Sequence, residues 1–310
     1  MQSYYLGIDM GSVSTNLVLM DENKKLQHKL YLRSKGRPVD SLQEGFRKLA
    51  EQAGEYRVKG AGVTGSGRSL IGALVGADSI KNEITAHAVA AATYRPDVRT
   101  ILEIGGQDSK LIWMKEGLVE DFAMNTVCAA GTGSFLDRQA ARLGISIEDL
   151  GMLAEKSKEP VRIAGRCAVF AESDMIHKQQ EGCKREDILR GLCQALVRGF
   201  IANLAGGRDL AGPVLFQGGV AANPGIKTAF EEELKLPVEV PPYYDVMGAW
   251  GAAILAQETM QQTGEETRFH QDQLSVEGTL TMMECSGCAN RCQVVRDESG
   301  KAWGSRCGKY

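Results

Sequence analysis

The feature that most constrains the fold is a pattern of apolar runs and glycine turns that occurs twice. Residues 4–20 hold two apolar runs separated by a turn at Gly11, and residues 100–114 hold two more separated by a Gly-Gly turn. Short apolar runs bounded by glycine and small polar residues are typical of strands joined by tight turns. The two copies share little sequence identity, so the pattern predicts a structural repeat with one α/β sheet domain built on each copy.

The length of the chain supports this division. At 310 residues the chain is too long for one ordinary core and suits two domains with a small appendage. The predicted parts are residues 1–95 with 247–262, residues 96–246, and a linker with a cysteine-rich tail at 263–310.

Helix signals lie between the strands. Ser41 and Glu44 have capping-box spacing ahead of an apolar face, which predicts a helix from about Ser41 to Ala53. Asn223 followed by Pro224 combines a favoured N-cap residue with proline at the first helical position, which predicts another helix start.

Charge and composition exclude several classes of protein. The formal charge is −3, and without a basic stripe or a polybasic patch we expect no binding to nucleic acid or to a membrane surface. The start of the chain has no signal-peptide pattern, and no apolar run is long enough to span a bilayer. Eight cysteines without a secretory signal indicate thiols, a metal or an iron–sulfur cluster rather than disulfides. We therefore expect a cytoplasmic protein.

The first candidate phosphate site is the segment from Gly7 to Thr15. A glycine turn between two strands lets backbone N–H groups and small hydroxyls face an anion, while Asp9 could hold Mg²⁺ through water. An ordinary hairpin with a solvated aspartate explains this segment equally well when it is taken alone.

Two further segments strengthen the phosphate-site interpretation. Glu103–Lys110 and Phe216–Asn223 also place a Gly-Gly turn at the end of an apolar run. The lysine-bearing phosphate loop GxxxxGK[ST] and the dinucleotide fingerprint GxGxxG are both absent from the sequence. Three glycine turns at strand ends therefore indicate a different class of nucleotide site.

In these turns the sequence, from residue 1 to about 260, resembles the superfamily of actin, sugar kinases and heat-shock ATPases. The resemblance implies two ribonuclease-H-like domains, with ATP phosphates held by the first two turns and adenosine contacted by the third. It implies catalytic roles near Mg²⁺ for Asp9 and Asp108, with Gln107 orienting water. Glu103 stands where the superfamily usually has aspartate. The nucleotide-binding residues implied are Gly11, Ser12, Ser14, Thr15, Glu103, Gly105, Gly106, Gly131, Gly133, Gly218, Gly219 and Asn223.

Two cysteines stand ahead of predicted helices. Cys128 precedes one helical stretch and Cys167 leads toward another. A thiolate at a helix N-terminus is stabilised by the free N–H groups and the helix dipole, which suits a ligand to an anionic cluster. A 4Fe–4S cluster needs four protein ligands, which two identical chains with two cysteines each would supply. Position alone still favours the plainer interpretation of two buried structural cysteines.

The residues around these cysteines change that balance. Cys-Ala-Ala-Gly-Thr-Gly from Cys128, Cys-Ala-Val-Phe-Ala-Glu from Cys167 and Glu-Ile-Gly-Gly-Gln-Asp-Ser-Lys from Glu103 resemble the ATP-dependent activators of 2-hydroxyacyl-CoA dehydratases and benzoyl-CoA reductases. The resemblance implies that Cys128 and Cys167 ligate a 4Fe–4S cluster shared by a homodimer. It also implies that ATP hydrolysis drives single electrons from a ferredoxin or flavodoxin into an iron–sulfur partner enzyme. A small-molecule kinase of the same fold and an ATP-binding redox sensor are the alternatives.

The remaining cysteines differ in character. Cys193 shares a helical face with leucines and is expected in the core, whereas Cys183 follows Gly182 in a polar turn and has no partner at ligand spacing. The tail has the pattern C-x2-C-x3-C-x14-C around a possible hairpin, which predicts a metal site for zinc or a second iron–sulfur cluster. Its candidate ligands are Cys285, Cys288, Cys292 and Cys307. Short activators lack this tail, so the reductase of a double-cubane cluster protein is a further candidate.

Overall fold

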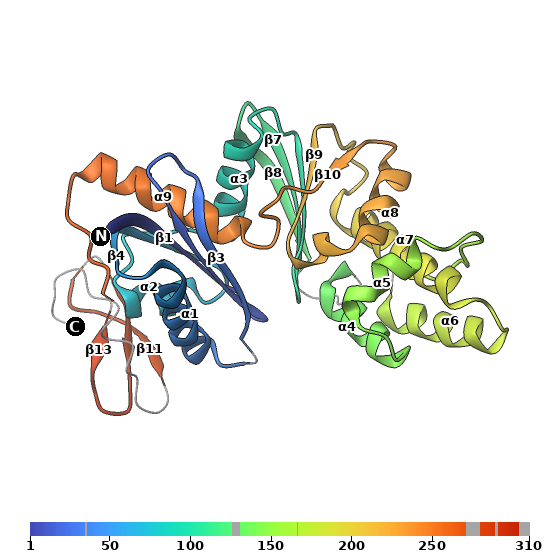
Figure 1. The fold of residues 1–310 in the computed structure, drawn as a ribbon, viewed down its shortest axis with the longest axis horizontal. Coiled ribbons are helices and arrows are strands. Elements are labelled where there is room, and N and C mark those ends of the chain that lie inside the picture. The colour runs from blue at the N-terminus through green and yellow to red at the C-terminus, as the bar shows by residue number, and fades with distance from the viewer. Residues whose placement is uncertain (35, 126–130, 166, 271–279, 289–290, 304–310) are drawn as a thin grey trace. The chain divides into compact units, whose positions relative to one another are not determined.

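The chain folds as two compact units. The computed structural model describes all residues except 35, 126–130, 166, 271–279, 289–290 and 304–310. One unit comprises Met1–Ala90 with Val246–Tyr310, and the other comprises Ala91–Asp245 (Figure 1). None of the helices in the described parts of the chain is long and apolar enough to cross a bilayer.

The first unit is built on a five-stranded sheet of order β3-β2-β1-β4-β5. Strands β1 to β3 form an antiparallel meander, and β4 and β5 continue the sheet in parallel with β1. Its elements are β1 (Gln2–Met10), β2 (Ser14–Met20), β3 (Leu26–Arg33), α1 (Pro38–Ala53), β4 (Tyr56–Thr64), α2 (Arg68–Val75), β5 (Ser79–Ile80), α3 (Glu83–Tyr94, which runs into the second unit), α9 (Met247–Thr263), β11 (Thr281–Glu284), β12 (Gln293–Arg296) and β13 (Ala302–Trp303).

The second unit repeats this topology, with a sheet of order β10-β9-β6-β7-β8. Strands β6 to β8 form an antiparallel meander, and β9 and β10 extend it in parallel with β6. The predicted structural repeat is therefore confirmed at the level of the sheets. The elements are β6 (Thr100–Ile104), β7 (Ser109–Lys115), β8 (Leu118–Asn125), α4 (Gly133–Arg142), α5 (Ile147–Ala154), α6 (Ala168–Gln180), α7 (Arg185–Leu204), β9 (Val214–Gln217), the short 3-10 helix η2 (Gly219–Ala222), α8 (Pro224–Leu234) and β10 (Val238–Glu239).

Helix α9 covers one face of the first sheet at very short range. A Cβ atom added to Gly7 or to Gly62 would lie 1.9 Å from a backbone carbonyl oxygen of α9, that of Ala249 or of Ala252. Side chains alternate between the faces of a strand, so Asp9, two residues after Gly7, also lies on the α9 face. Because Gly7 and Gly62 have no side chains, α9 packs close to β4 and to β1, the strand that carries Asp9.

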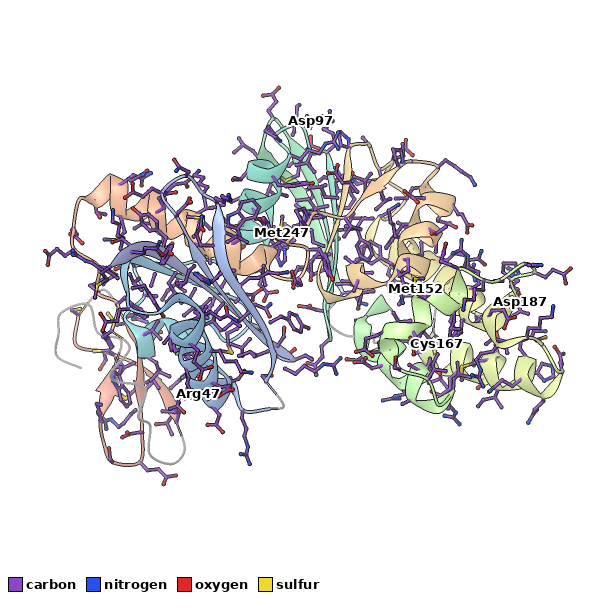
Figure 2. The ribbon with its side chains drawn as sticks, viewed as in Figure 1. Arg47, Asp97, Met152, Cys167, Asp187 and Met247 are labelled. Carbon is purple, nitrogen blue, oxygen red and sulfur yellow. The ribbon has the colours of Figure 1, made fainter. Side chains whose placement is uncertain are left out.

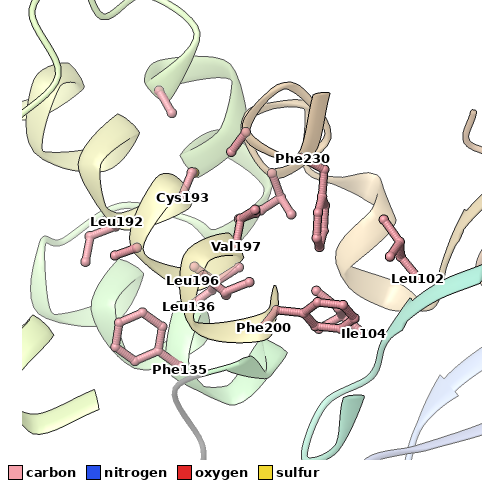
Figure 3. Close-up of a cluster of buried hydrophobic side chains, with 14 of the residues drawn as sticks. Leu102, Ile104, Phe135, Leu136, Leu192, Cys193, Leu196, Val197, Phe200 and Phe230 are labelled. Atoms are coloured by element: carbon pink, nitrogen blue, oxygen red, sulfur yellow. The ribbon is translucent and has the colours of Figure 1, made fainter. Parts of the chain in front are cut away.

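The core of the second unit collects around α7. Its buried side chains pack against those of α4, α8 and the sheet, and Phe200 meets Phe230 edge-to-face with ring centroids 5.3 Å apart (Figure 3). Cys193 is fully buried in this cluster, as its position on the apolar face predicts. Burial raises the pKa of its thiol to about 12, which keeps it protonated and unreactive.

The segment after α9 packs on the first unit, although its polar sequence suggests a free linker. The carboxylate of Asp78 accepts hydrogen bonds from the Thr267 hydroxyl at 2.6 Å and from the Arg268 backbone N–H at 2.9 Å. Further along, the described part of the tail forms the small sheet β11-β12-β13. Val295 and Trp303 from that sheet are buried in the core of the first unit, which fixes the sheet against this core.

One predicted helix start is wrong. Helix α1 begins at Pro38 with Arg37 as N-cap, one turn before the capping box suggested by Ser41 and Glu44. Proline already has the helical φ angle and needs no N–H partner, so it starts the helix earlier and leaves Ser41 inside it.

The glycine contacts under α9 give a stability prediction. We expect Gly62→Ala to lower the free energy of unfolding by about 2 kcal/mol or more, because the new methyl group would overlap the Ala252 carbonyl and force α9 away from β4. Urea denaturation followed by circular dichroism measures this change. Gln52→Ala on the exposed side of α1 is the control and should change the free energy by less than about 0.5 kcal/mol. Equal stability of the two variants would contradict the packing described here.

Candidate functional site

A row of polar residues crosses the first sheet near the ends of β1 and β4 and the start of β2. Asp9 on β1 lies opposite Asn16 on β2 and opposite Thr64 on β4. Both neighbours are buried, although they carry polar side chains. Directly after this row the strands enter the glycine turns at Gly11 and Gly65. The row contains one acid and no basic residue, so the carboxylate of Asp9 has the chemistry to bind a cation.

The second sheet carries the corresponding row. Glu103 on β6 lies opposite Lys110 on β7 and opposite Gln217 on β9. All three are buried, with Lys110 only 1% exposed. The two rows occupy equivalent positions in the repeat, but lysine in the second unit replaces asparagine in the first. The two halves of the molecule therefore differ in charge at equivalent places.

Lys110 forms ion pairs with two acidic residues. Its ammonium nitrogen lies 2.9 Å from Oε2 of Glu103 and 3.1 Å from Oδ2 of Asp108. A buried charge is tolerated when it is paired in this way. Glu103, which the resemblance placed among the nucleotide-binding residues, thus has its carboxylate on this lysine, and Asp108 is the more exposed of the two acids. Sequence reasoning gave Lys110 no role, although Lys110 occupies the position in the second sheet that corresponds to Asn16 in the first.

Two glycines in the left-handed region close equivalent turns. Gly65 has φ 93° and Gly218 has φ 88°, a conformation that L residues with side chains rarely adopt. An added Cβ atom would lie 2.3 Å from the Met10 carbonyl oxygen at Gly65, and 2.4 Å from the Ile104 carbonyl oxygen at Gly218. The turn at Gly65 was not among the predicted nucleotide-binding turns. Its equivalence to the predicted turn at Gly218 is the signal that would have found it.

The first glycine turn is held by its own backbone. The Gly11 N–H donates to the Ser14 carbonyl at 2.9 Å, and Ser12 is exposed at the tip. Ser14 is half-buried. The Thr15 hydroxyl instead points into the interior and donates to the sulfur of Met10 at 3.3 Å. The structure therefore brings Gly11, Ser12 and Ser14 together but turns the Thr15 hydroxyl away from them.

Asp9 also lies near His87, which sequence reasoning did not connect with it. A Cβ atom built on Gly248, in the first turn of α9, would lie 2.2 Å from Oδ2 of Asp9 and 3.2 Å from Nε2 of His87. The carboxylate and the imidazole therefore meet over this glycine. His87, to which the sequence analysis assigned no role, thus lies close to the Asp9 carboxylate.

The second glycine turn is bonded to the start of α4. The Gly133 N–H donates to the Gly105 carbonyl at 2.9 Å, and the Ser134 N–H donates to the Gly106 carbonyl at 2.8 Å. The Ser134 hydroxyl donates to the same Gly106 carbonyl. A Cβ atom on Gly133 would also lie 3.1 Å from Val220, which follows the third turn. The second turn, the third turn and the N-terminus of α4 thus come together in the second unit.

The other predicted nucleotide-binding residues surround this meeting point. Gln107 is exposed at the tip of the second turn, and a Cβ atom on Gly131 would lie 3.4 Å from the side-chain nitrogen of Asn125. Gly219 opens the short helix η2. The Asn223 side chain accepts the Ile226 N–H at 3.1 Å and so caps α8, which confirms the predicted helix start. Its adenosine contact remains a prediction.

Cys167 is the N-cap residue of α6 and is half-buried (Figure 2). The loop before it is fixed to two helices: the Ala164 N–H donates to Asp174 of α6 at 2.8 Å, and Arg198 of α7 donates to the Ile163 carbonyl at 2.7 Å. A Cβ atom on Gly165 would lie 2.8 Å from the Ala195 carbonyl of α7. The position of Cys167 is therefore tied to both α6 and α7.

The other predicted ligands lie partly outside the described residues. Cys128 and Cys307 are among the residues not described. In the tail, the Cys285 N–H donates to the Cys292 carbonyl at 2.8 Å, and the Gly287 N–H points at the Cys285 sulfur at 3.4 Å. Within the described ranges, no three His, Cys, Asp or Glu side chains form a metal-binding group. The tail site therefore remains a prediction.

Comparison with known proteins identifies the family. Residues 6–256 match the model of the BadF/BadG/BcrA/BcrD ATPase family. The chain belongs to this family. It is 34% identical over 259 residues to the (R)-2-hydroxyglutaryl-CoA dehydratase activating ATPase of Acidaminococcus fermentans, covering 83% of this chain and 98% of that protein.

Solved structures agree with this assignment. The activator of the 2-hydroxyisocaproyl-CoA dehydratase from Clostridium difficile with bound ADPNP matches at a TM-score of 0.77 and 31% identity, covering 86% of this chain and all of that one, 100%. A ROK family glucokinase from Streptomyces griseus, in complex with glucose and AMPPNP, matches at a TM-score of 0.52 with 13% identity, covering 82% of this chain and 99% of that one, and this likeness shows the fold alone. The predicted fold of two actin-like ATPase domains is confirmed.

The buried lysine gives the prediction for this site. We expect Lys110→Met to lower the free energy of unfolding by about 3–5 kcal/mol, because Glu103 is then a buried charge without its cation. ATP hydrolysis should fall by about a hundredfold as Asp108 loses its position. Urea denaturation and a phosphate-release assay measure the two effects.

A double variant and a control separate the effect of the buried charge on stability from the effect of Lys110 on ATP hydrolysis. Lys110→Met combined with Glu103→Gln removes both buried charges and should recover most of the stability but little of the ATP hydrolysis. Lys115→Met, at the exposed end of the same strand, is the control. If Lys110→Met were as stable and as active as this control, the role assigned to Lys110 would be wrong.

Proposed function

We propose that this chain is an ATP-driven reductase whose homodimer delivers single electrons to an iron–sulfur partner enzyme. Membership of the ATPase family supports the first part of the proposal. The related proteins include activators of CoA-ester dehydratases, one of which was solved with a bound ATP analogue. The partner is then an enzyme of the 2-hydroxyacyl-CoA dehydratase, benzoyl-CoA reductase or double-cubane cluster type.

The glycine turns supply the ATP chemistry in this proposal. Asp9 and Asp108 approach Mg²⁺, and Gln107, exposed at the second turn, orients the attacking water. The backbone N–H groups of the turns face the phosphates. The charge difference between the two polar rows supports the assignment of Asp9 as the main carboxylate for the cation, because Glu103 is already paired with Lys110.

The observation that carries the redox part is the place of Cys167. It stands at the free N-terminus of α6, where backbone N–H groups and the helix dipole favour a thiolate bound to an anionic cluster. Directly after it, Val169 is 69% exposed and Phe170 is 65% exposed. Exposed apolar side chains next to a candidate ligand suit an interface between two copies of the chain. The donor set and its surroundings therefore fit a shared cluster.

Two candidate ligands per chain account for one cluster if two copies of the chain share it. Cys128 and Cys167 from each chain provide the four ligands of one 4Fe–4S cluster on the two-fold axis. When bound, the cluster would supply the one-electron chemistry. A ferredoxin or flavodoxin is the proposed donor, and the reduced cytoplasm is the compartment in which such thiols persist.

Nucleotide and redox chemistry are linked only if the nucleotide states favour different dimer geometries. For a one-electron couple, each tenfold change in the equilibrium constant between two dimer geometries shifts the reduction potential of the cluster by about 59 mV. The hydrogen bonds between the second glycine turn and α4 connect the phosphate site to the helix that follows Cys128. A rearrangement at the phosphates therefore has a direct route to the cysteine-bearing part of the second unit.

Two other functions remain as alternatives. A small-molecule kinase would transfer phosphate without iron, and a redox sensor would bind ATP without turning it over. Anaerobic purification followed by iron analysis excludes the kinase if the dimer carries about four iron atoms. An ATPase assay with a reduced donor and a partner enzyme excludes the sensor if electron transfer consumes ATP.

The ligand assignment gives a sharp prediction. Cys167→Ala, purified without oxygen, should lose the cluster iron and its brown colour while ATP still binds, because two of the four bridging ligands are gone from the dimer. Iron analysis, visible absorption and ATP titration measure these properties. Cys183→Ala is the matched control, since Cys183 is half-buried in a turn of the same unit, and it should keep the iron. Full iron content in Cys167→Ala would overturn the assignment.

We also propose that the tail binds a metal ion or cluster of its own. The Gly287 N–H aimed at the Cys285 sulfur and the adjacent backbone of Cys292 suit thiolate ligands, with Cys288 and Cys307 completing four. Cys288→Ser should remove about one zinc per chain, or the iron of a second cluster, and leave the bridging cluster intact. Metal analysis of the wild type and this variant measures the difference. Identical metal contents would contradict the tail site.

A further inference from the structure

We infer that Glu172 is a positioning residue that joins the helix behind the second phosphate turn to the helix capped by Cys167. The inference rests on the proposed function and adds a defined mechanical route within the second unit. It assigns a role to a side chain that lies outside both the glycine turns and the cysteine ligands.

The first section of the route is the contact between the second glycine turn and α4. Three hydrogen bonds, from the N–H of Gly133 and from the N–H and hydroxyl of Ser134, end on the carbonyls of Gly105 and Gly106. A Cβ atom on Gly133 would lie 3.0 Å from the Gly105 carbonyl oxygen, so α4 packs tightly against this turn. A shift of the turn when the γ-phosphate arrives or leaves therefore moves the N-terminus of α4.

The second section runs from α4 to α6 through Glu172. The Glu172 carboxylate accepts a hydrogen bond and an ion pair from Arg142 at the end of α4, and Gln139, one turn earlier, approaches it at 3.5 Å. Gln139 is buried and its Oε1 atom has no hydrogen-bond partner among the described residues. One carboxylate of α6 thus contacts two side chains of α4.

The third section leads back along α6 to the cysteine. Cys167 caps α6 one and a half turns before Glu172, and the Ala171 N–H donates to the Cys167 carbonyl at 2.9 Å. Asp174 on the same helix holds the backbone of Ala164 in the loop before the cysteine. Movement of α6 at Glu172 therefore reaches Cys167 through a continuous helical and hydrogen-bonded segment.

The pair itself is partly exposed, with Arg142 at 48% and Glu172 at 23% of full side-chain exposure. Such pairs contribute little to folding stability. Removing Glu172 should therefore leave the fold intact and change the communication between the two sites, which makes the two roles separable by experiment.

The test uses the iron-loaded dimer under anaerobic conditions. The rate of iron removal by a chelator is measured with Mg-ADPNP and with Mg-ADP, and the ratio of the two rates reports the coupling. Glu172→Ala should lower this ratio about fivefold, the lower end of the range found for coupled sites, while ATP hydrolysis continues. General loosening of the protein would raise both rates and leave the ratio unchanged.

A second readout does not depend on iron. Hydrogen–deuterium exchange of residues 168–176 should respond to ADPNP in the wild type and lose most of this response in Glu172→Ala. Glu181→Ala is the matched control, because the ion pairs of Glu181 among the described residues are with Lys178 and His177 at the same end of α6, and this variant should keep the response. Exchanging the charges, with Arg142→Glu and Glu172→Arg together, should restore the response, since the new guanidinium can also donate to Gln139 Oε1.

The outcomes separate the two proposals. A wild type without iron overturns the proposed function, while the exchange experiment still decides on the route. A wild-type exchange response that survives unchanged in Glu172→Ala overturns the role of Glu172. Absence of any nucleotide response in α6 of the wild type overturns the route as a whole.

Discussion

The first turn of α4 donates three hydrogen bonds to the carbonyls of the second glycine turn, and the arrangement of the second unit follows from this contact. It favours glycine at position 133, because a Cβ atom there would make tight contacts with the Gly105 carbonyl at 3.0 Å and with Val220 at 3.1 Å. It also uses N–H groups that every helix leaves without an intrahelical partner. Backbone groups that could satisfy water or an anion are here used to attach a helix to a turn, so the turn cannot move independently of that helix.

The repeat explains why the two units resemble each other in shape and differ in chemistry. In both, a row of polar residues crosses three neighbouring strands beside the glycine turns, and a glycine with positive φ closes one of these turns. Lys110 changes the second row, because its ammonium group is shared by Glu103 and Asp108. One ammonium group thus pairs with two acids of the second unit, whereas Asp9 in the first unit lies against a glycine of α9 that also faces His87. One fold thus places acidic residues in two different electrostatic settings.

The sequence was sufficient to predict those features that depend on local signals. The three glycine turns, the capped start of α8 at Asn223 and the burial of Cys193 all follow from neighbouring residues, and the structure agrees with each of them. Features that depend on distant residues could not be predicted in this way. Asp78 holds Thr267 and Arg268 although 189 positions separate Asp78 from Thr267, so the segment after α9 resembles a linker only in its composition.

The same limit applies to the site. Lys110 is unremarkable in the sequence, and its importance arises from the register that places it opposite Glu103. Glu172 likewise looks like an exposed helical glutamate until α4 is seen to reach it. Weak surface pairs of this kind are poor sources of stability but are suited to communication, because a contact worth little relative to the whole fold can be made in one nucleotide state and lost in another without unfolding either. A tightly packed core could not be rearranged so cheaply, since interiors are close-packed and resist continuous deformation. We therefore expect the residues that would link nucleotide to cysteine in this chain to lie on such half-exposed contacts between helices, outside both the hydrophobic core and the glycine turns.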